Sequence, residues 1–317
     1  MPGAVRPGHL SLAEERAGEE QAAEDALPSD LARQAVALWP EAAVPGALHV
    51  VSTPIGHLGD ISLRALAVLS ECAAVYCEDT RTSRTLLSRY GIRTPMLALH
   101  EHNEAAATPR VVERLRRGDA LALISDAGTP LVSDPGARVT DAVVAAGLRV
   151  VPVPGPSATL AALVASGLSP HPCTMLGFLP RKGAERAALL QLAASLPHAV
   201  VLFEAPGRVA DTLREVAAAS SGARRGAIAR ELTKRFEEIR RGTLDELAAY
   251  YEETPPRGEI VIVLAGVTAP PPASDDDLQS AAAAWRTEGR RPREIVQLLM
   301  DEHGASRNVA YRLAHDT

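Results

Sequence analysis

The chain has 317 residues, of which 46% are hydrophobic and 23% charged; these are ordinary globular values that exclude a wholly disordered or collagen-like protein. No apolar run approaches the roughly 20 residues of a membrane span, because Arg149 and several prolines interrupt the best candidate. The net charge of −6 is uneven: residues 1–46 carry −5 and residues 274–317 carry −2, which leaves the centre near +1. This balance permits an anionic substrate but excludes a uniformly basic nucleic-acid coat.

The cysteine pattern and the N-terminus indicate where the protein works. Cys72, Cys77 and Cys173 form no C-x-x-C pair, and their odd number favours a reducing compartment. Residues 1–46 contain acids and no continuous apolar core, so they do not resemble a signal peptide. We therefore expect a cytoplasmic protein with no membrane attachment. The acidic segment itself is predicted to be mostly disordered, with one short helix near 31–39.

Apolar runs of strand length alternate with helical patterns from residue 47, which predicts βα units and a largely parallel sheet in a first domain, residues 47–155. Its strands are expected at 48–52, 73–77, 95–99, 120–125 and 149–153, with helices at 62–70, 81–90, 104–117 and 135–146. A second α/β domain, residues 156–268, has helices at 158–167, 184–195, 208–219 and 244–253. Its strands, at 173–178, 199–204, 226–231, 235–241 and 259–264, crowd together near the end, so we expect a mixed sheet.

The last part of the chain is predicted to be a linker followed by a small helical module. Residues 269–277 contain three prolines and three acids and are typical of a linker. Residues 278–317 predict a helix-turn-helix-like tail, with helices at 293–302 and from Ser306 to Leu313. Such a tail would present to nucleic acid the side chains of Arg307, Asn308, Tyr311 and Arg312. A capping or dimerisation module explains the same pattern equally well.

Small-residue loops follow the predicted strands, where open α/β sheets place ligand sites. The first, Thr53-Pro54-Ile55-Gly56-His57-Leu58-Gly59-Asp60, lacks the dinucleotide-binding G-x-G-x-x-G pattern, and a glycine-rich connection with Asp60 as helix cap also explains it. In the second, Asp126-Ala127-Gly128 has no capping role and leaves room for a ligand. Asp134 and Pro135, further along, are predicted to be a helix cap and first turn. The third, Pro154-Gly155-Pro156-Ser157-Ala158, ends in a helix N-terminus that can bind an anion.

Two polar segments in the first domain can handle a substrate. In Glu78-Asp79, Asp79 is explained as a helix cap, which leaves Glu78 without a structural reason. His100 and His102 are spaced as metal ligands could be, but further ligands are missing, so a polar substrate-facing loop is favoured. Asn103 is compatible with a cap on the following helix. Arg181 and Lys182, between glycine and proline, suit phosphate contact or a solvated basic turn.

Nine motifs in one order resemble the ribosomal RNA small subunit methyltransferase I family, which has a tetrapyrrole-methylase-like fold of two α/β domains with parallel and mixed sheets. The resemblance spans about residues 48–266, and the helical tail is similar too. The motifs are Val51-Ser52-Thr53-Pro54-Ile55-Gly56 with Leu58-Gly59-Asp60-Ile61, Glu78-Asp79-Thr80-Arg81, His100-Glu101-His102-Asn103-Glu104, Ser125-Asp126-Ala127-Gly128-Thr129-Pro130, Ser133-Asp134-Pro135-Gly136, Pro154-Gly155-Pro156-Ser157-Ala158, Gly177-Phe178-Leu179-Pro180-Arg181-Lys182-Gly183, Ala229-Arg230-Glu231-Leu232-Thr233-Lys234 and Gly258-Glu259-Ile260-Val261.

The resemblance implies a methyltransferase that uses S-adenosylmethionine, without a metal, to methylate a cytidine 2′-oxygen in the decoding region of 16S ribosomal RNA. It implies a homodimer that acts on the small ribosomal subunit. The implied cofactor contacts are Pro54, Gly56, Asp126, Ala127, Gly128, Thr129, Ser157, Ala158, Phe203 and Ala229. Catalysis is expected from Glu78, Asp79 and His102, and substrate binding from Arg81, His100, Asn103, Arg181 and Lys182.

Two positions depart from the family pattern: His57 stands where the family usually has Asn, and Gly207 where it usually has His. The second departure removes a side chain that could touch RNA or cofactor. Two other functions remain open, a methyltransferase of the same fold acting on a tetrapyrrole or other small molecule, and a non-catalytic RNA-binding assembly protein. The intact loops at 126–130 and 154–158 argue against the latter.

Overall fold

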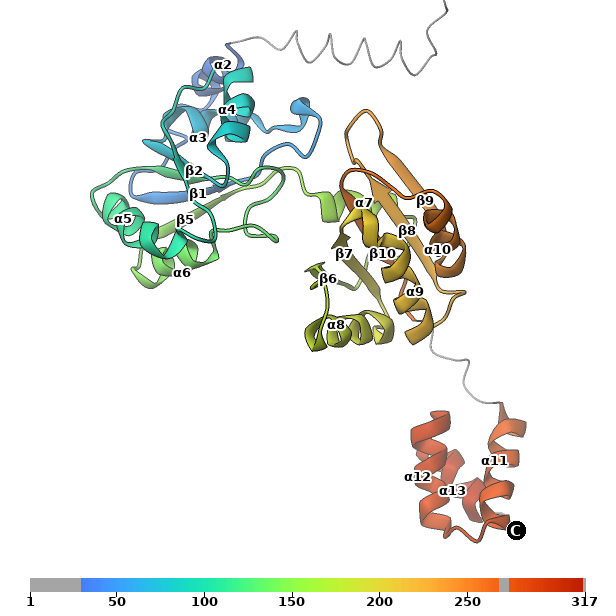
Figure 1. Ribbon diagram of the computed structural model, residues 1–317. Coiled ribbons are helices and arrows are strands. Elements are labelled where there is room, and N and C mark those ends of the chain that lie inside the picture. Colours follow the sequence, from blue (N-terminus) through green and yellow to red (C-terminus); the bar gives the residue numbers. More distant parts are fainter. Residues whose placement is uncertain (1–29, 268–273, 316–317) are drawn as a thin grey trace, which may run out of the picture. The chain divides into compact units, whose positions relative to one another are not determined.

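The computed structural model describes residues 30–267 and 274–315, which belong to two compact units (Figure 1). The larger unit ends at Ala265 and contains two five-stranded sheets, and the smaller unit begins at Gly266 and is helical. Over the residues described, no helix combines the length and the apolar character that a membrane crossing requires.

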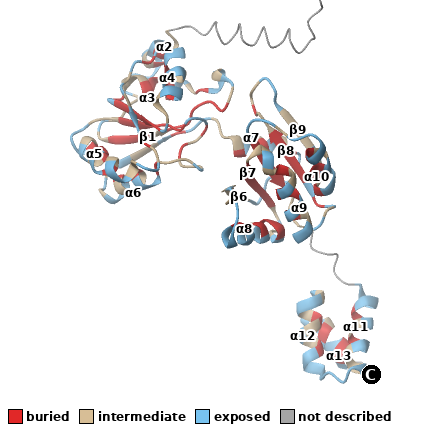
Figure 2. Cartoon of the chain, viewed as in Figure 1, coloured by how far each residue is buried: buried red, intermediate tan, exposed pale blue. Residues whose placement is uncertain are grey.

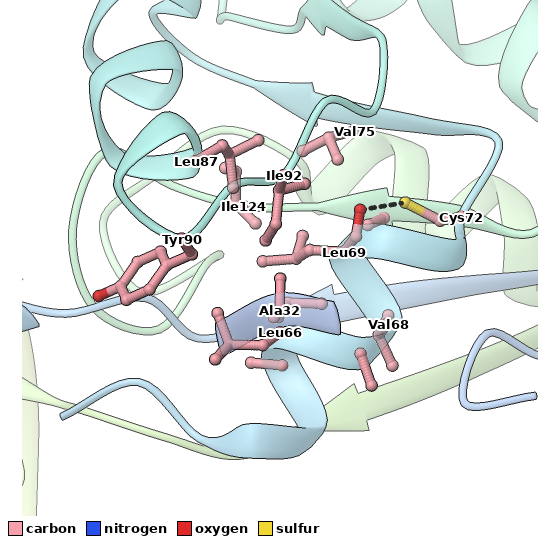
Figure 3. Close-up of a cluster of buried hydrophobic side chains, with 14 of the residues drawn as sticks. Ala32, Leu66, Val68, Leu69, Cys72, Val75, Leu87, Tyr90, Ile92 and Ile124 are labelled. Carbon is pink, nitrogen blue, oxygen red and sulfur yellow. Dashed lines mark hydrogen bonds between the residues drawn. The ribbon is translucent and has the colours of Figure 1, made fainter. Parts of the chain in front are cut away.

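The first sheet is wholly parallel, as the alternating pattern predicts, and has the order β3-β2-β4-β1-β5. Successive residues of β2 point to opposite faces of the sheet. Val75 packs in an apolar cluster with α3 and α4, and Tyr76 packs in a second cluster with α5 and α6, so helices cover both faces. Figure 3 shows the first cluster. The strands are β1 (Ala47–Val51), β2 (Ala74–Cys77), β3 (Met96–Ala98), β4 (Leu121–Leu123) and β5 (Arg149–Val153), and the helices α3 (Leu63–Glu71), α4 (Thr80–Arg89), α5 (Glu104–Arg116) and α6 (Ala137–Ala145).

The N-terminal segment contributes to this first domain from residue 30 onward. Helix α2 (Leu31–Leu38), expected near 31–39, buries Ala32 and Ala35 in the cluster that contains Leu66 and Leu69 of α3 (Figure 3). The Glu71 carboxylate then accepts hydrogen bonds from two backbone amides of the segment 41–43, at 3.2 and 3.1 Å. Residues 30–46 are thus packed on the first domain, although the sequence places them in an extension. The remainder of that predicted extension, 1–29, lies outside the described residues.

The second sheet is mixed, as expected, with the order β6-β7-β10-β8-β9 and one parallel pair, β6 with β7. Its central strand β10 is an uninterrupted apolar run that is buried along its whole length. Much of β7 and β8 is buried as well, as Figure 2 shows. Helices α8, α9 and α10 cover one face, whereas α7 and Ile55, from the loop after β1, pack on the other. The elements are β6 (Cys173–Phe178), β7 (Ala199–Glu204), β8 (Arg225–Arg230), β9 (Glu238–Thr243), β10 (Ile260–Leu264), α7 (Ala158–Ala165), α8 (Ala184–Ser195), α9 (Val209–Ala219) and α10 (Leu244–Glu253).

In its described residues, 274–315, the smaller unit has one helix more than the sequence predicts. Its helices α11 (Asp275–Thr287), α12 (Pro292–His303) and α13 (Arg307–His315) share an apolar core around Ile295, Leu299 and Leu313. Helix α11 begins inside the expected 269–277 linker, which is a correction: Ser274 caps it, and the three acids assigned to the linker form its first turn. Negative charge is stabilised at a helix N-terminus by the backbone dipole, so these acids favour the helix. Residues 268–273 of the expected linker lie outside the described residues.

Two helix starts also differ from expectation. Asp60 does not cap α3, because residues 58–60 form a short 3-10 turn and the hydroxyl of Ser62 accepts the cap hydrogen bond from the Ala65 amide at 3.1 Å. Asp134 does not cap α6, since that helix begins only at Ala137, with Gly136 at the cap position in a left-handed conformation (φ +119°). Asp134 therefore does not have the helix-capping role that the sequence suggests.

Candidate functional site

The site lies at the carboxyl ends of the adjacent strands β1 and β4. After β1 the chain continues to β2, towards one edge of the sheet, and after β4 it continues to β5, at the other edge. This reversal of strand order opens a crevice in open α/β sheets. The loops that follow the two strands are joined by reciprocal backbone hydrogen bonds between Thr53 and Gly128, at 2.9 and 3.1 Å. The Thr129 hydroxyl accepts from the hydroxyl of Ser52 at 3.1 Å and donates to the Pro156 carbonyl at 3.0 Å, so the loop after β5 is tied in as well.

A cavity of about 360 Å³ lies next to these loops and is lined by residues of both sheets' domains. Glycine is needed at position 128 because its φ is +80° and a Cβ there would lie 3.2 Å from Ile55. Seven of the ten residues expected to contact a cofactor line the cavity: Asp126, Ala127, Gly128, Thr129, Ser157, Ala158 and Phe203. Ser157 also caps α7 as expected, accepting from the Leu160 amide at 3.5 Å.

The other three expected contacts are not in the cavity wall. Pro54 is buried within the first loop, and Ala229 is buried in the apolar cluster under α7. Gly56 faces the loop after β8, where a Cβ would lie 2.5 Å from a side-chain carbon of Lys234. The conformation of this glycine loop is thus explained by close packing between two loops, and the neighbouring His57 amide donates to the hydroxyl of Thr233 at 3.0 Å.

One wall of the cavity is aromatic. Phe178 at the end of β6 and Phe203 on β7 have ring centroids 5.1 Å apart, with the planes tilted by 41°. The Phe178 side chain is 58% exposed, although burying a phenylalanine is favourable by about 1.5–3 kcal/mol. The chain has only three phenylalanines, and two of them line this cavity. Sequence reasoning did not assign Phe178 to the site, although the motif 177–183 that contains it begins at the end of β6.

A carboxylate missed by sequence reasoning, Asp134, lines the cavity together with Asp126. Burial and the nearby negative charge of Glu78 raise the pKa of Asp134 to about 6. Its neighbour Ser133 has a left-handed backbone (φ +68°), which costs a non-glycine residue of order 1 kcal/mol. A side chain at Gly177 would lie 2.8 Å from the Ser133 hydroxyl, so β6 and this strained turn are closely apposed.

The two expected catalytic residues after β2, Glu78 and Asp79, lie in different environments. Asp79 caps α4, accepting from the Arg81 amide at 2.8 Å, and pairs with the Arg81 guanidinium at 2.8 Å, which lowers the pKa of Asp79 to about 2. Its own amide donates to the Asp126 carboxylate at 3.2 Å. Partial burial and the charge of Asp126 raise the pKa of Glu78 instead. Negative charge is therefore concentrated at the strand ends, from residues far apart in sequence.

The histidine loop is held in place by Asn103. Its side-chain oxygen accepts from the His100 amide at 2.9 Å and its amide group donates to the Ala98 carbonyl at 3.0 Å, so its side chain does not cap α5. The rings of His100 and His102 have centroids 6.0 Å apart, and the buried Nδ1 of His100 has no hydrogen-bond partner among the described residues. Over these residues no three His, Cys, Asp or Glu side chains converge as metal ligands do.

The basic pair Arg181 and Lys182 lies on the exposed loop between β6 and α8, and neither forms an ion pair with a described acid. The loop follows directly from Phe178, so the pair is a few residues from the cavity wall. At the two positions that depart from the family pattern, the His57 ring accepts from the Gly59 amide at 3.1 Å, and Gly207, inside η2 (Pro206–Arg208), has open space where a side chain would stand.

A buried ion network lies at the end of β7, next to the residues of that strand that line the cavity. Glu204 is among the residues that line the cavity, and its carboxylate is fully buried behind the wall. This carboxylate pairs with Arg208 at 2.5 Å and Arg186 at 3.6 Å and accepts from the Thr212 hydroxyl at 2.7 Å. Arg186 also binds Glu215 at 2.8 Å. These contacts fix the end of β7, next to Phe203.

The chain is similar in sequence to known proteins over most of its length. Residues 47–248 match the family model described as Tetrapyrrole (Corrin/Porphyrin) Methylases. A Mesorhizobium japonicum protein named Ribosomal RNA small subunit methyltransferase I is 51% identical over 214 residues, which are 67% of this chain and 73% of that protein. A protein of the same name from Streptococcus pyogenes serotype M1 is 38% identical over 274 residues, 86% of this chain and 95% of that protein.

Solved structures agree with the fold. A diphthine synthase aligns with a TM-score of 0.55 at 16% identity, covering 69% of this chain and 90% of the other. A uroporphyrin-III C-methyltransferase from Thermus thermophilus, solved with S-adenyl homocysteine, aligns with a TM-score of 0.51 at 19% identity, covering 70% and 98%. At these identities the likeness shows the fold alone, and it confirms the expected pair of α/β domains.

Proposed function

We infer the function from family membership: the chain belongs to the tetrapyrrole methylase family and, within it, to the ribosomal RNA small subunit methyltransferase I proteins. The protein transfers a methyl group from S-adenosylmethionine to the 2′-oxygen of a cytidine ribose in the decoding region of 16S ribosomal RNA. The observation that carries this proposal is the cavity, because a single space brings together the small-residue loops, an aromatic pair and several acidic residues.

The residues of the cavity fit this cofactor. Ala127, Gly128 and Ala158 leave backbone exposed to a ligand, and Phe178 and Phe203 offer apolar ring faces to a heteroaromatic base. The carboxylates beside them suit the positive charges of an amino acid and a sulfonium. When bound, S-adenosylmethionine supplies an electrophilic methyl group whose leaving group is a neutral thioether. The protein must then hold the nucleophile in line, and such positioning contributes roughly 7–11 kcal/mol.

Asp134 is the side chain best placed to accept the proton of the ribose hydroxyl. It lines the cavity, and an ordinary Asp would be a much weaker base than one whose pKa is raised to about 6. Of the expected catalytic residues, Glu78 acts by keeping the pKa of Asp134 high, whereas Asp79 is committed to Arg81 and positions the strand end. His102, exposed beside His100, is assigned to the nucleotide-facing loop.

Substrate contacts come from the polar rim. Arg81 keeps 90% of its side chain exposed despite its ion pair, and His100 and Asn103 form the ordered loop after β3. Arg181 and Lys182 supply cations for RNA phosphates on the side of the second domain.

The function is tested by incubating the protein with labelled S-adenosylmethionine and unmodified small ribosomal subunits, followed by mapping of ribose methylation. We expect one labelled cytidine in the decoding region. Filling the cavity by Ala127→Trp should abolish cofactor binding in calorimetry and labelling, whereas Ala137→Trp, on the exposed start of α6, should change neither. Label entering a precorrin-like tetrapyrrole but not RNA would replace the proposal by a small-molecule methyltransferase. RNA binding without cofactor binding would indicate a non-catalytic assembly protein.

The protein acts as a homodimer, and an uncovered apolar stripe on α7 supports this proposal. Thr159 and Leu163 pack inward, whereas Leu160 and Val164, one turn apart, are 58% and 75% exposed. Exposed apolar stripes of this kind mark protein interfaces. We expect Leu160→Glu with Val164→Glu to convert a dimer into a monomer in sedimentation velocity, while Leu38→Glu, at a similarly exposed leucine, leaves the dimer intact. A double variant that sediments like the wild type would exclude α7 from the interface.

A further inference from the structure

The loop between β8 and β9, residues 231–237, holds an aromatic side chain away from the core. Phe236 is 60% exposed, and the guanidinium carbon of Arg235 lies 5.2 Å from its ring centroid. The other two phenylalanines line the cavity, so Phe236 is the one whose exposure the proposed cofactor site does not explain.

This loop is rigidly built. The Thr233 amide donates to the Glu237 carboxylate at 2.6 Å, and the amides of Lys234 and Glu237 each close a backbone turn at 3.0 Å. Glu231 and Thr233 have left-handed backbones, with φ of +50° and +63°. Strained conformations persist where the surroundings over-determine them, and such places cluster at ligand-binding sites. Phe236 is therefore presented by an ordered turn, so little conformational entropy is lost when a partner binds it.

The loop adjoins the proposed methylation site. Lys234 Nζ lies 3.0 Å from the carboxylate of Glu259, which lines the cavity, and 3.0 Å from that of Glu231. On its other side, the hydroxyl of Thr233 accepts from the His57 amide in the loop after β1. Phe236 is two residues from Lys234 and three from Thr233, so it lies close to the rim at which an RNA substrate must arrive.

The charges around Phe236 select the kind of partner. Lys234 is neutralised by two acids, Glu237 is used by the turn, and Glu238 is paired with Arg230 and Arg240. Arg235 is exposed and forms no ion pair with any described acid. The tip therefore offers an aromatic face next to a free guanidinium, which suits an unpaired base and its phosphate better than a purely apolar partner.

We propose that Phe236 and Arg235 form a stacking platform for an unpaired base of the RNA substrate, next to the nucleotide that is methylated. This inference rests on the proposed function and adds a binding subsite to it. Stacking needs a π-face, so tryptophan can replace phenylalanine there but leucine cannot, even though leucine keeps much of the apolar area.

The test measures binding of a decoding-region RNA fragment to the full-length protein by fluorescence anisotropy. Phe236→Ala and Phe236→Leu should each weaken binding by about 5- to 150-fold, and Phe236→Trp should not. Arg235→Ala should reduce the slope of log affinity against log salt by about 1. Leu192→Ala, at an exposed apolar side chain on α8, is the matched control and should bind as the wild type does. Cofactor affinity by calorimetry should remain unchanged in all of these variants.

A second readout identifies the stack itself. With 2-aminopurine placed in turn at the positions flanking the target cytidine, one position should be quenched by the wild type and by Phe236→Trp but not by Phe236→Leu. If the wild type methylates RNA and the Ala and Leu variants bind it equally well, the platform is excluded while the proposed function stands. A changed oligomeric state in Phe236→Ala would assign the ring to an interface instead. A wild type that neither binds nor methylates RNA would overturn both.

Discussion

Replacing Asp134 by Asn is expected to lower the rate of methyl transfer by about 10²–10⁴-fold, the usual contribution of a general base. Asn preserves the shape of the side chain but cannot accept the ribose proton. The effect should appear in the single-turnover rate, with little change in the affinity for cofactor or RNA. Asp141→Asn, at an exposed aspartate on α6, is the matched control and should retain the full rate.

The pH dependence of the wild type gives the same residue a second test. A proton acceptor works only when ionised, and Asp134 ionises as the pH rises through its pKa of about 6. Activity should therefore increase with pH through a midpoint near 6, and the residual activity of Asp134→Asn should lack this limb. A rate that stays constant between pH 5 and pH 8 in the wild type would exclude Asp134 as the base.

Stability provides the folding control for this variant. Because the folded-state pKa of Asp134 is raised, the folded protein binds a proton between about pH 4 and 6 that the unfolded chain has released. Ionising Asp134 therefore reduces stability as the pH rises through that window. Asp134→Asn removes this cost, so its urea midpoint at pH 8 should be no lower than that of the wild type.

Replacing Glu204 by Ala should lower the free energy of unfolding by about 3–5 kcal/mol, which is the usual cost of breaking a buried ion pair from one side. Arg186, only 9% exposed, would keep Glu215, but Arg208 would lose its sole carboxylate among the described residues. The Thr212 hydroxyl would lose its acceptor as well. Urea denaturation monitored by circular dichroism measures this loss.

An exposed ion pair on the same domain supplies the comparison. Glu252 pairs with Arg214 at 3.1 Å with its side chain 63% exposed, so Glu252→Ala should cost less than about 1 kcal/mol. Because the Glu204 network fixes the end of β7 next to Phe203, its loss should weaken cofactor binding, which the Glu252 variant should not. Equal stabilities of the two variants would show that the buried network contributes no more than a surface pair.

Local sequence patterns predicted the secondary structure well because its causes are local. The buried run 260–264 and the alternation of strands and helices before it depend on apolar spacing within one element. The patterns failed where two local explanations competed. Asp134 before a proline looks like a helix cap, and the acids at 275–277 after three prolines look like a linker, yet Gly136 and Ser274 take the cap positions.

The candidate site was predictable in part. Loops that follow parallel strands must meet at one edge of a sheet, and the motifs in these loops indicated Asp126–Thr129 and Ser157, which line the cavity. Sequence could not reveal Phe178 or Asp134 as cavity residues, since each depends on a partner domain or a distant loop. Gly56 was expected to contact the cofactor but does not line the cavity. It instead packs against Lys234, which is 178 positions later in the sequence.

The sequence alone determined the order of elements, the two kinds of sheet and the loops that carry small residues, because these follow from periodicity and turn chemistry over a few neighbouring positions. Only the tertiary structure decided which carboxylate is desolvated, which glycine is crowded and which aromatic rings face a cavity. Electrostatic and packing environments are made by groups tens to hundreds of residues apart, and the chain brings these together only when it folds.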